Sequence, residues 1–325
     1  MKITTIKGRL AFTASLLISW SSVSIANTGF IILGDSGTGK DPQFKVAESI
    51  KQTCTVNQCD FALGLGDNIY EVGPWSTKDS QFNTKFEAPY NDLDFPFFMV
   101  LGNHDNSLLI PGDGGLNLRG YLEVKYTKLS EKWKMPKRYY SFETPANEAL
   151  FIGYDSNPPS AYLPAIFNPY FWPNGWYMKS QKSWIKKEIA GNDSPWKFAF
   201  AHHPYVTNGH HEADKLIQGR KPYNQFVEDT LCDKVDFIFA GHEHALEVLE
   251  PVDSCGKTVH VVSGAAAKNT GRYRDNPTHS VMWDSYDDKW GYFHGQVTDT
   301  TFTLTAYVVD EVGDTVQAFQ KVFTK

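Results

Sequence analysis

The sequence lacks long runs of either charge, internal repeats and low-complexity linkers. Charged interaction tails, solenoids and disordered connections are therefore not indicated. Basic residues are also in the minority, with 31 Lys and Arg against 37 Asp and Glu and a net charge of −6. Because the first 26 residues carry three basic residues and no acidic one, the remainder has a charge of −9. An acidic body argues against a nucleic-acid-binding surface, which needs clustered Lys and Arg.

Beyond the N-terminus, the sequence has no apolar run long enough to cross a bilayer. At the N-terminus, three basic residues precede an apolar stretch, Leu10 to Trp20, and the small-residue site Ser24-Ile25-Ala26. This order is typical of a cleavable secretory signal. A membrane anchor is the alternative, but Ser and Thr interrupt the stretch and its apolar core is short. We therefore expect a signal over residues 1–26, a mature chain that is periplasmic or secreted, and no stable membrane insertion.

Cysteine is scarce, with only four residues: Cys54, Cys59, Cys232 and Cys255. An even number in an exported chain indicates two disulfides, for which three connectivities exist. The pairs Cys54–Cys59 and Cys232–Cys255 are predicted because each closes a local loop. A zinc site is the alternative, but the spacings are not the paired C-x-x-C of such sites.

Apolar residues make up 41% of the chain, and 325 residues permit one large domain. Five short segments share a pattern in which an apolar run stops abruptly at Gly, Asp, Asn or His. Continuous apolar runs bounded by turn residues predict strands that are buried on both faces. These strands are expected at Phe30–Leu33, Phe61–Leu65, Phe97–Leu101, Phe198–Ala201 and Phe237–Ala240.

Helical spacing of apolar residues predicts helices between these strands, at Gln43–Gln52, Gln181–Ala190 and Pro222–Leu231. The combination predicts a layered α/β fold, in which functional residues stand at the ends of the strands. We expect one domain over residues 27–325. Further strands are predicted at Arg138–Glu143, Ala149–Tyr154, Thr258–Ser263, Gly291–Val297 and Thr301–Val309.

The residues at the five strand ends form a mixed set of nitrogen and oxygen donors. Singly, a Gly-Asp after a strand is usually a turn, and a lone His is usually structural. Together, two Asp, one Asn and three His suit iron, zinc or manganese, whereas the common surface residues Glu and Lys are missing from most of these positions. The candidate ligands at the strand ends are Asp35, Asp67, Asn103, His202, His242 and His244.

Tyr70 follows Asp67 by three residues, so a helical turn would bring both side chains to one centre. A phenol has a pKa near 10 and becomes a good ligand only beside a strong Lewis acid such as Fe³⁺. Aromatic packing is the alternative for Tyr70. In Gly241-His242-Glu243-His244 the two histidines alternate with Glu243. An extended backbone would place both histidines on one face and Glu243 on the other.

Five blocks carry a family resemblance: GDSG at 34–37, GDNIY at 66–70, GNHD at 102–105, HHP at 202–204 and GHEH at 241–244. They resemble the signature blocks of metallophosphoesterases, in the family's order and spread over most of the mature chain. Many of those enzymes have Asp-x-His in the first block. Here Gly37 stands at the histidine position, and Tyr70 supplies the missing ligand. That exchange is typical of the purple acid phosphatases, and the chain resembles their small, single-domain, tartrate-resistant type.

The resemblance implies a four-layer α/β/β/α sandwich of two mixed sheets flanked by helices. It implies that Asp35, Tyr70 and His244 bind Fe³⁺ and that Asp67 bridges both metals. The divalent ion, Fe²⁺, Zn²⁺ or Mn²⁺, is expected on Asn103, His202 and His242. His202 is preferred over His203 because the family's ligand stands two residues before the proline, here Pro204.

Other roles follow from the same resemblance. His104 would help to bind phosphate and handle protons, and Asn68 would donate a hydrogen bond behind the ligands. His210 and His211 lie where the family often keeps a histidine that faces the substrate, although either could be a solvated surface residue. The pocket walls are expected from loops within residues 71–95, 106–135 and 155–180.

The expected function is an exported acid phosphatase that hydrolyses small phosphomonoesters by direct attack of a metal-bound hydroxide. A phosphodiesterase or nucleotidase on the same fold is one alternative, and a non-catalytic binding protein is a more distant one. A serine hydrolase is not indicated, because the sequence lacks the G-x-S-x-G motif.

Overall fold

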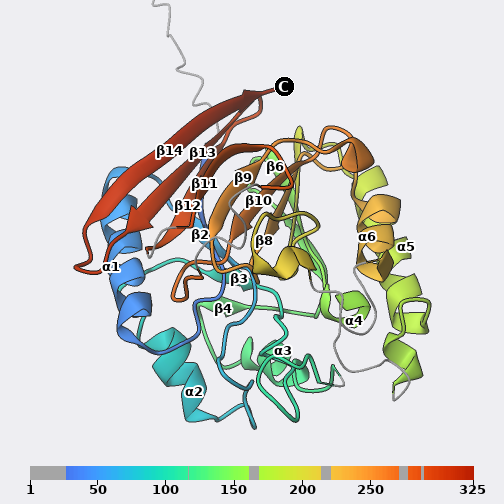
Figure 1. Cartoon of the computed structure of the whole chain (residues 1–325), viewed down its shortest axis with the longest axis horizontal. Helices are drawn as coiled ribbons and strands as arrows, with labels where there is room; N and C mark the ends of the chain where they lie inside the picture. Colours follow the sequence, from blue (N-terminus) through green and yellow to red (C-terminus); the bar gives the residue numbers. More distant parts are fainter. Residues whose placement is uncertain (1–26, 116, 161–167, 214–220, 271–276, 287–288) are drawn as a thin grey trace, which may run out of the picture.

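The computed structural model describes residues 27–115, 117–160, 168–213, 221–270, 277–286 and 289–325. The predicted signal, residues 1–26, lies outside the described residues. Two seven-stranded sheets pack face to face, with helices on their outer faces (Figure 1). The predicted sandwich of two mixed sheets flanked by helices is confirmed.

The first sheet, sheet A, combines a parallel and an antiparallel half. Strands β1 to β4 run parallel to one another, and β12, β13 and β14 continue the sheet from β1 in antiparallel order. The order across the sheet is β14 (Thr315–Thr324), β13 (Thr301–Val309), β12 (Trp290–Val297), β1 (Thr28–Leu33), β2 (Phe61–Gly64), β3 (Phe97–Met99) and β4 (Trp133–Lys134).

The second sheet, sheet B, has four central parallel strands, β6, β7, β8 and β10, with antiparallel neighbours at both edges. Its order is β11 (Val281–Ser285), β9 (Leu246–Leu249), β10 (Val259–Ser263), β8 (Phe237–Ala240), β7 (Trp196–Ala201), β6 (Ala149–Gly153) and β5 (Tyr140–Glu143).

Phenylalanine fills the space between the sheets. The ring of Phe30 on β1 lies 5.1 Å from Phe151 on β6 and 5.9 Å from Phe198 on β7, measured between centroids. Because side chains alternate along a strand, the neighbours Leu150 and Ala199 face the opposite side of sheet B, where they pack beneath the helices. Strands of this kind are buried on both faces, which explains why their sequences read as continuous apolar runs.

The helices bury one face each. Helix α1 (Asp41–Val56) begins with Pro42 in its first turn and packs on sheet A, whereas α5 (Trp176–Ala190) and α6 (Lys221–Thr230) cover sheet B. Short helices lie in the connections: α2 (Ser80–Phe82) with the π-turn Asn83–Glu87, α3 (Tyr121–Tyr126), α4 (Asn157–Ser160) and 3₁₀ turns at Pro169–Phe171, His210–Ala213 and Asp253–Cys255.

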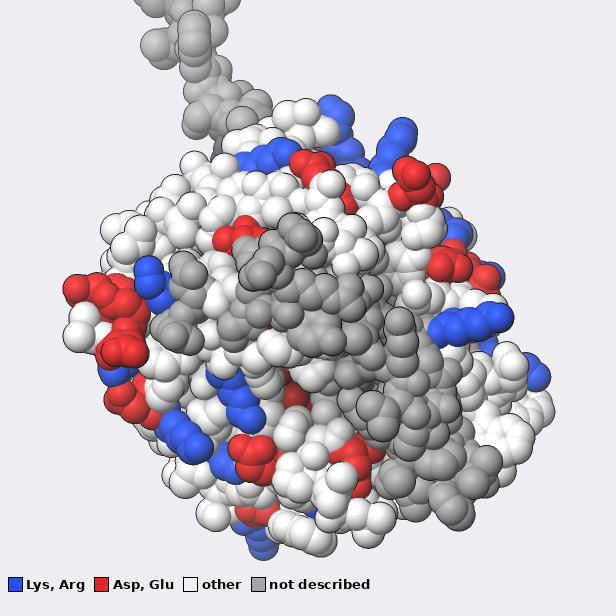
Figure 2. Space-filling model, in the orientation of Figure 1, with Lys and Arg blue, Asp and Glu red and all other residues white. Residues whose placement is uncertain are grey.

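Both predicted disulfides are confirmed. Cys54–Cys59 ties the end of α1 to the approach to β2, and Cys232–Cys255 ties the residues after α6 to the turn before β10. No helix among the described residues is long and apolar enough to cross a membrane. On the described part of the face in Figure 2, Lys and Arg side chains are interspersed with Asp and Glu side chains.

Candidate metal centre

The five predicted strand ends meet where the two sheets come together. Strands β1, β2 and β3 of sheet A and β7 and β8 of sheet B are parallel strands, so within each sheet their carboxyl ends share one edge. Glycine allows the loops to approach closely. A Cβ atom on Gly241 would lie 2.6 Å from Asp35 Oδ2, and one on Gly34 would lie 3.2 Å from Gly241 Cα. The loops of both sheets therefore form one site.

A first donor group consists of Asp35, Tyr70 and His244. The Tyr70 hydroxyl donates a hydrogen bond of 2.7 Å to Asp35 Oδ1 and lies 3.3 Å from His244 Nε2. His244 Nε2 is 3.4 Å from the same carboxylate oxygen. Asp35 and Tyr70 are buried. These are the three residues that the family resemblance assigns to Fe³⁺, and the structure brings their donor atoms together.

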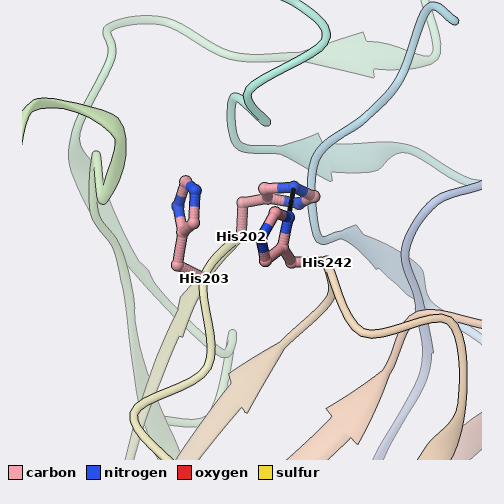
Figure 3. Close-up of side chains that lie close together, drawn as sticks. All are labelled: His202, His203 and His242. Atoms are coloured by element: carbon pink, nitrogen blue, oxygen red, sulfur yellow. Dashed lines mark hydrogen bonds between the residues drawn. The ribbon is translucent and has the colours of Figure 1, made fainter. Parts of the chain in front are cut away.

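A second donor group consists of Asn103, His202 and His242. His202 Nε2 lies 2.8 Å from Asn103 Oδ1 and 3.1 Å from His242 Nδ1, as the contact between the two histidines in Figure 3 shows. The Nδ1–H of His202 donates to the carbonyl oxygen of Leu65 at 2.9 Å. In the neutral imidazole, the Nε2 lone pair therefore faces the amide oxygen of Asn103. Two acceptors that face one another are stabilised by a cation between them.

Asp67 lies between the two donor groups. Its Oδ1 atom is 3.4 Å from His202 Nε2, and ligand atoms of Asp35, Asp67 and His202 all lie within 4.8 Å of one another. Its carboxylate also accepts a hydrogen bond of 2.9 Å from the backbone N–H of His104. Burial opposes ionisation, but His202 and His104 outweigh it and lower the pKa of Asp67 to about 2. The buried carboxylates and histidines are consistent with a dinuclear metal site.

The protonation states of two donors also suit a cation. Burial, with the neighbouring His211 and other histidines, lowers the pKa of His242 well below its usual value, so its imidazole is neutral. Burial and the charges of Asp35 and Asp67 raise the pKa of Tyr70 well above 10. A phenol in that environment ionises only when a strongly acidifying ion binds its oxygen.

The local backbone differs from two expectations. Residues 67–70 form no helical turn and include a bend at 69–70, and residues 242–245 form a bend rather than an extended segment. Asp35, Asp67 and His242 have φ angles of 57°, 52° and 68°, in the left-handed region that few side chains adopt. Strained backbone of this kind is concentrated at functional sites. The left-handed residues change the direction of the backbone where it leaves each strand. This change brings the donor atoms together without a helix.

The predicted histidines around the donors occupy different places. His104 donates from Nδ1 to the carbonyl oxygen of Glu71 at 2.7 Å, and its Nε2 lies 4.0 Å from Asp67 Oδ2. The ring of His211 lies 4.0 Å from that of His242, whereas His210 is exposed. His203 also lies beside His202 and His242 (Figure 3), with Nδ1 2.8 Å from Ser156 Oγ.

Asn68 supports the loops rather than the donors themselves. Its amide donates to Asp105 Oδ2 at 3.0 Å and to Glu123 Oε2 at 3.1 Å. Asp105 in turn accepts the backbone N–H groups of Ile69 and Gly102, at 3.0 and 2.7 Å. The carboxylate of Asp105 therefore joins the loops after β2 and β3. Sequence reasoning missed this role, although Asp105 is the last residue of the GNHD block.

On sheet B, the buried residues Glu243 and Glu247 hold a loop in place by accepting its backbone N–H groups. The Oε2 atom of Glu243 accepts the backbone N–H of His211 at 2.8 Å. Gly209 makes room for it, since a Cβ there would lie 1.9 Å from the Glu243 carboxyl carbon. Glu247 accepts the backbone N–H of Asn208 at 2.9 Å. Both buried carboxyls hold the loop that carries His211, and no local sequence signal identifies either.

Lys268 is a further residue that the sequence did not indicate. Its Nζ atom lies 3.8 Å from the centroid of the Tyr70 ring and 3.5 Å from Glu71 Oε1. The lysine therefore places a positive charge against the aromatic face of a proposed ligand.

Comparison with known proteins gives the same family as the sequence blocks. A family model described as calcineurin-like phosphoesterase matches residues 29–246. The chain is 28% identical to purple acid phosphatase 7 of Arabidopsis thaliana over 84% of this chain and 78% of that protein. It is 24% identical to rat tartrate-resistant acid phosphatase type 5, over 77% and 75% of the two chains, and 23% identical to the human protein, over 91% and 92%.

Solved structures share the fold. GAP50, the anchor in the inner membrane complex of Plasmodium, matches with a TM-score of 0.68 and 19% identity, over 92% of this chain and 89% of that one. The purple acid phosphatase PPD1 of yellow lupin matches with a TM-score of 0.65 and 15% identity, over 92% of this chain and 54% of that one. The protein is a calcineurin-like metallophosphoesterase, distantly homologous to the tartrate-resistant and purple acid phosphatases.

Proposed function

We propose that this protein is an exported acid phosphatase that hydrolyses phosphomonoesters at an Fe³⁺ and divalent-metal pair. The first donor group carries the proposal. The Tyr70 oxygen lies 2.7 Å from Asp35 Oδ1 and 3.3 Å from His244 Nε2, in a buried setting that raises its pKa well above 10. Only a strong Lewis acid such as Fe³⁺ makes that phenol a good ligand. Asn103, His202 and His242 would hold Fe²⁺, Zn²⁺ or Mn²⁺, and Asp67 would be shared.

Hydrogen bonds behind the donors orient their ligand atoms. The Asn103 amide donates to the carbonyl oxygen of Gly112 at 2.9 Å, which turns Oδ1 toward His202. The bond from His202 Nδ1–H to Leu65 selects the neutral tautomer whose Nε2 atom can bind a metal. His244 Nδ1 lies 3.1 Å from Thr270 Oγ1, so its Nε2 faces Tyr70 and Asp35. Such outer contacts fix the tautomer and direction of a ligand before the metal arrives.

Two metal ions bound here would lower the pKa of a water molecule and polarise the phosphoryl group. The protein's own proton donors are His104 and His211. The backbone contact of His104 Nδ1 directs its Nε2 toward Asp67, from which it could protonate the leaving alcohol. His211, whose ring packs on that of His242, is the second candidate. Because the nucleophile would be water, no side chain would become phosphorylated, and an acidic optimum is expected.

The proposal is tested with the exported form of the chain in the presence of iron. Hydrolysis of p-nitrophenyl phosphate is expected to be faster at acidic than at alkaline pH and faster than hydrolysis of bis(p-nitrophenyl) phosphate. Preference for the diester would instead support a phosphodiesterase. A phosphorylated side chain trapped by rapid quench would contradict direct attack by water. Detection of the chain in the periplasm or medium, without residues 1–26, would test the export prediction.

A further inference from the structure

An apolar loop stands in solvent beside the candidate centre. Leu108, Leu109 and Ile110 follow the GNHD block, and their side chains are 41%, 75% and 64% exposed. The Asp113 carboxylate accepts the backbone N–H groups of all three residues at 2.8 to 3.1 Å, and that of Gly115 at 2.8 Å. Four hydrogen bonds to one carboxylate give this segment a defined conformation. The backbone of this segment is therefore fixed in a conformation that leaves three consecutive apolar side chains exposed to solvent.

The loop is attached to the candidate centre by direct contacts. The carbonyl oxygen of Gly112 accepts the hydrogen bond from the Asn103 amide, and the N–H of Gly112 donates to Ser107 Oγ at 2.8 Å. Gly112 has a φ of 79°, and a Cβ atom there would lie 2.9 Å from His104 Nε2. The residue two positions after Ile110 thus touches both a proposed ligand and the proposed proton donor.

The apolar surface continues into a cavity of ≈ 400 Å³ behind the loop. Trp75, Leu108, Leu118 and Tyr121 line it, and each of these four is at least 41% exposed. Arg119 and Lys125 also line it, and the Arg119 guanidinium lies 3.6 Å from the centroid of the Trp75 ring. Its other wall is also tied to the centre, because Gly73 N–H donates to the carbonyl oxygen of His104 at 2.9 Å. The same two loops that carry His104 and Trp75 therefore form both the centre and the apolar cavity.

We infer that Leu109, Ile110 and this cavity form a subsite for an apolar leaving group, so that the substrates are phosphomonoesters of alkyl or aryl alcohols. This inference rests on the proposed function. A phosphoryl group held by the two donor groups would direct its leaving oxygen toward His104, and the loop begins there. A site for a partner protein would not require an apolar patch close to the centre, whereas the loop that carries this patch accepts a hydrogen bond from Asn103 through the Gly112 carbonyl oxygen.

The test measures binding of methyl-, butyl- and octylphosphonate to the metal-loaded protein by calorimetry. Because burial of each CH₂ strengthens binding about three- to fourfold, partial burial predicts that octylphosphonate binds at least about tenfold more tightly than methylphosphonate. The double variant Leu109→Ser, Ile110→Ser should lose most of this difference while its affinity for methylphosphonate and its metal content stay unchanged. Val312→Ser is the matched control, because Val312 is 77% exposed on the distant β13–β14 hairpin.

Equal affinities for the three phosphonates, a chain-length trend that survives in the double variant, or no phosphonate binding would each overturn the subsite. The outcome is separable from that of the proposed function. A protein that shows the trend but hydrolyses no phosphomonoester keeps the subsite and loses the phosphatase proposal. A protein that hydrolyses phosphomonoesters without the trend keeps the phosphatase proposal and loses the subsite.

Discussion

The two sheets contribute different chemistry to the candidate centre. The loops after the strands of sheet A supply oxygen donors, from Asp35, Asp67, Tyr70 and Asn103. The loops after the strands of sheet B supply imidazoles, from His202, His242 and His244. Neither donor group is complete within one sheet, because His244 joins the first and Asn103 joins the second. A metal bound to either group would therefore connect the sheets.

The buried carboxyl groups that hold the loops in place also differ between the two sheets. On sheet A, Asp105 joins the loops after β2 and β3 through the backbone N–H groups that it accepts. On sheet B, Glu243 and Glu247 hold one long loop against the segment that follows β8. On sheet A, the carboxylate therefore stabilises the loops that carry the donors. On sheet B, the two carboxyl groups stabilise the loop that carries His211. The predictions below separate these contributions.

The largest effect is expected from Asp67→Ala, because it removes the carboxylate between both donor groups. Activity should fall by about 10³-fold, and metal content should fall below the roughly two ions per chain expected of the native protein. Elemental analysis and a phosphatase assay measure both. Asp94→Ala, at an exposed acid of the β2–β3 connection, is the control. Retention of both metals in Asp67→Ala would show that Asp67 is not shared.

A smaller but more selective effect is expected at the paired histidines. His202→Ala should cost about a hundredfold in affinity for the second metal, because Nε2 of His202 faces Asn103 and Asp67. His203→Ala should keep both metals, since Nδ1 of His203 contacts Ser156 Oγ. Metal titration of the two variants makes the comparison. A loss of metal confined to His203→Ala would reverse the assignment.

A tenfold effect on kcat is expected when the hydrogen bond from His211 to Glu243 on sheet B is removed. Glu243→Ala removes the acceptor for the His211 N–H, so kcat should fall about tenfold while metal content stays constant. Glu243→Gln keeps an acceptor oxygen and should restore most of the activity. Glu131→Ala, at an exposed position, serves as the control. Equal losses in the Ala and Gln variants, or loss of metal, would contradict a positioning role.

The smallest effect concerns stability and Glu247. Burial raises the pKa of Glu247 to about 7, from 4.5 in the unfolded chain. The folded state therefore holds this proton more tightly, and the associated stability is present below pH 4.5 and lost as pH rises through 7. The loss amounts to about 3 kcal/mol. Chemical denaturation from pH 4.5 to 8 should show a weaker decline for Glu247→Gln than for the native protein. Identical pH profiles would exclude the contribution.

Much of the fold and of the candidate centre could be predicted from the sequence, because the relevant signals are local. Strands buried on both faces, such as β1 and β8, read directly as apolar runs. The residue types of the donors follow those runs within a few positions, and the structure brings all seven proposed ligands together. The two disulfides were predictable because each closes a short loop, with sequence separations of 5 and 23.

The features that escaped prediction depend on contacts between distant residues or on weak patterns. The last strand, β14, is an edge strand whose residues are exposed or half-buried, so it has no apolar run. Glu243 and His211 are 32 positions apart, and Asn68 and Glu123 are 55 apart. The left-handed backbone at Asp67 was missed because nothing in the residue type requires it there, whereas a glycine would have suggested it.

The most direct test of the account is the visible absorption spectrum of the iron-loaded protein, recorded beside that of Tyr70→Phe. We predict a broad purple band that disappears in the variant, with about two metal ions per chain in the native protein. A colourless protein that still binds two metals would contradict the assignment of Fe³⁺ to Asp35, Tyr70 and His244.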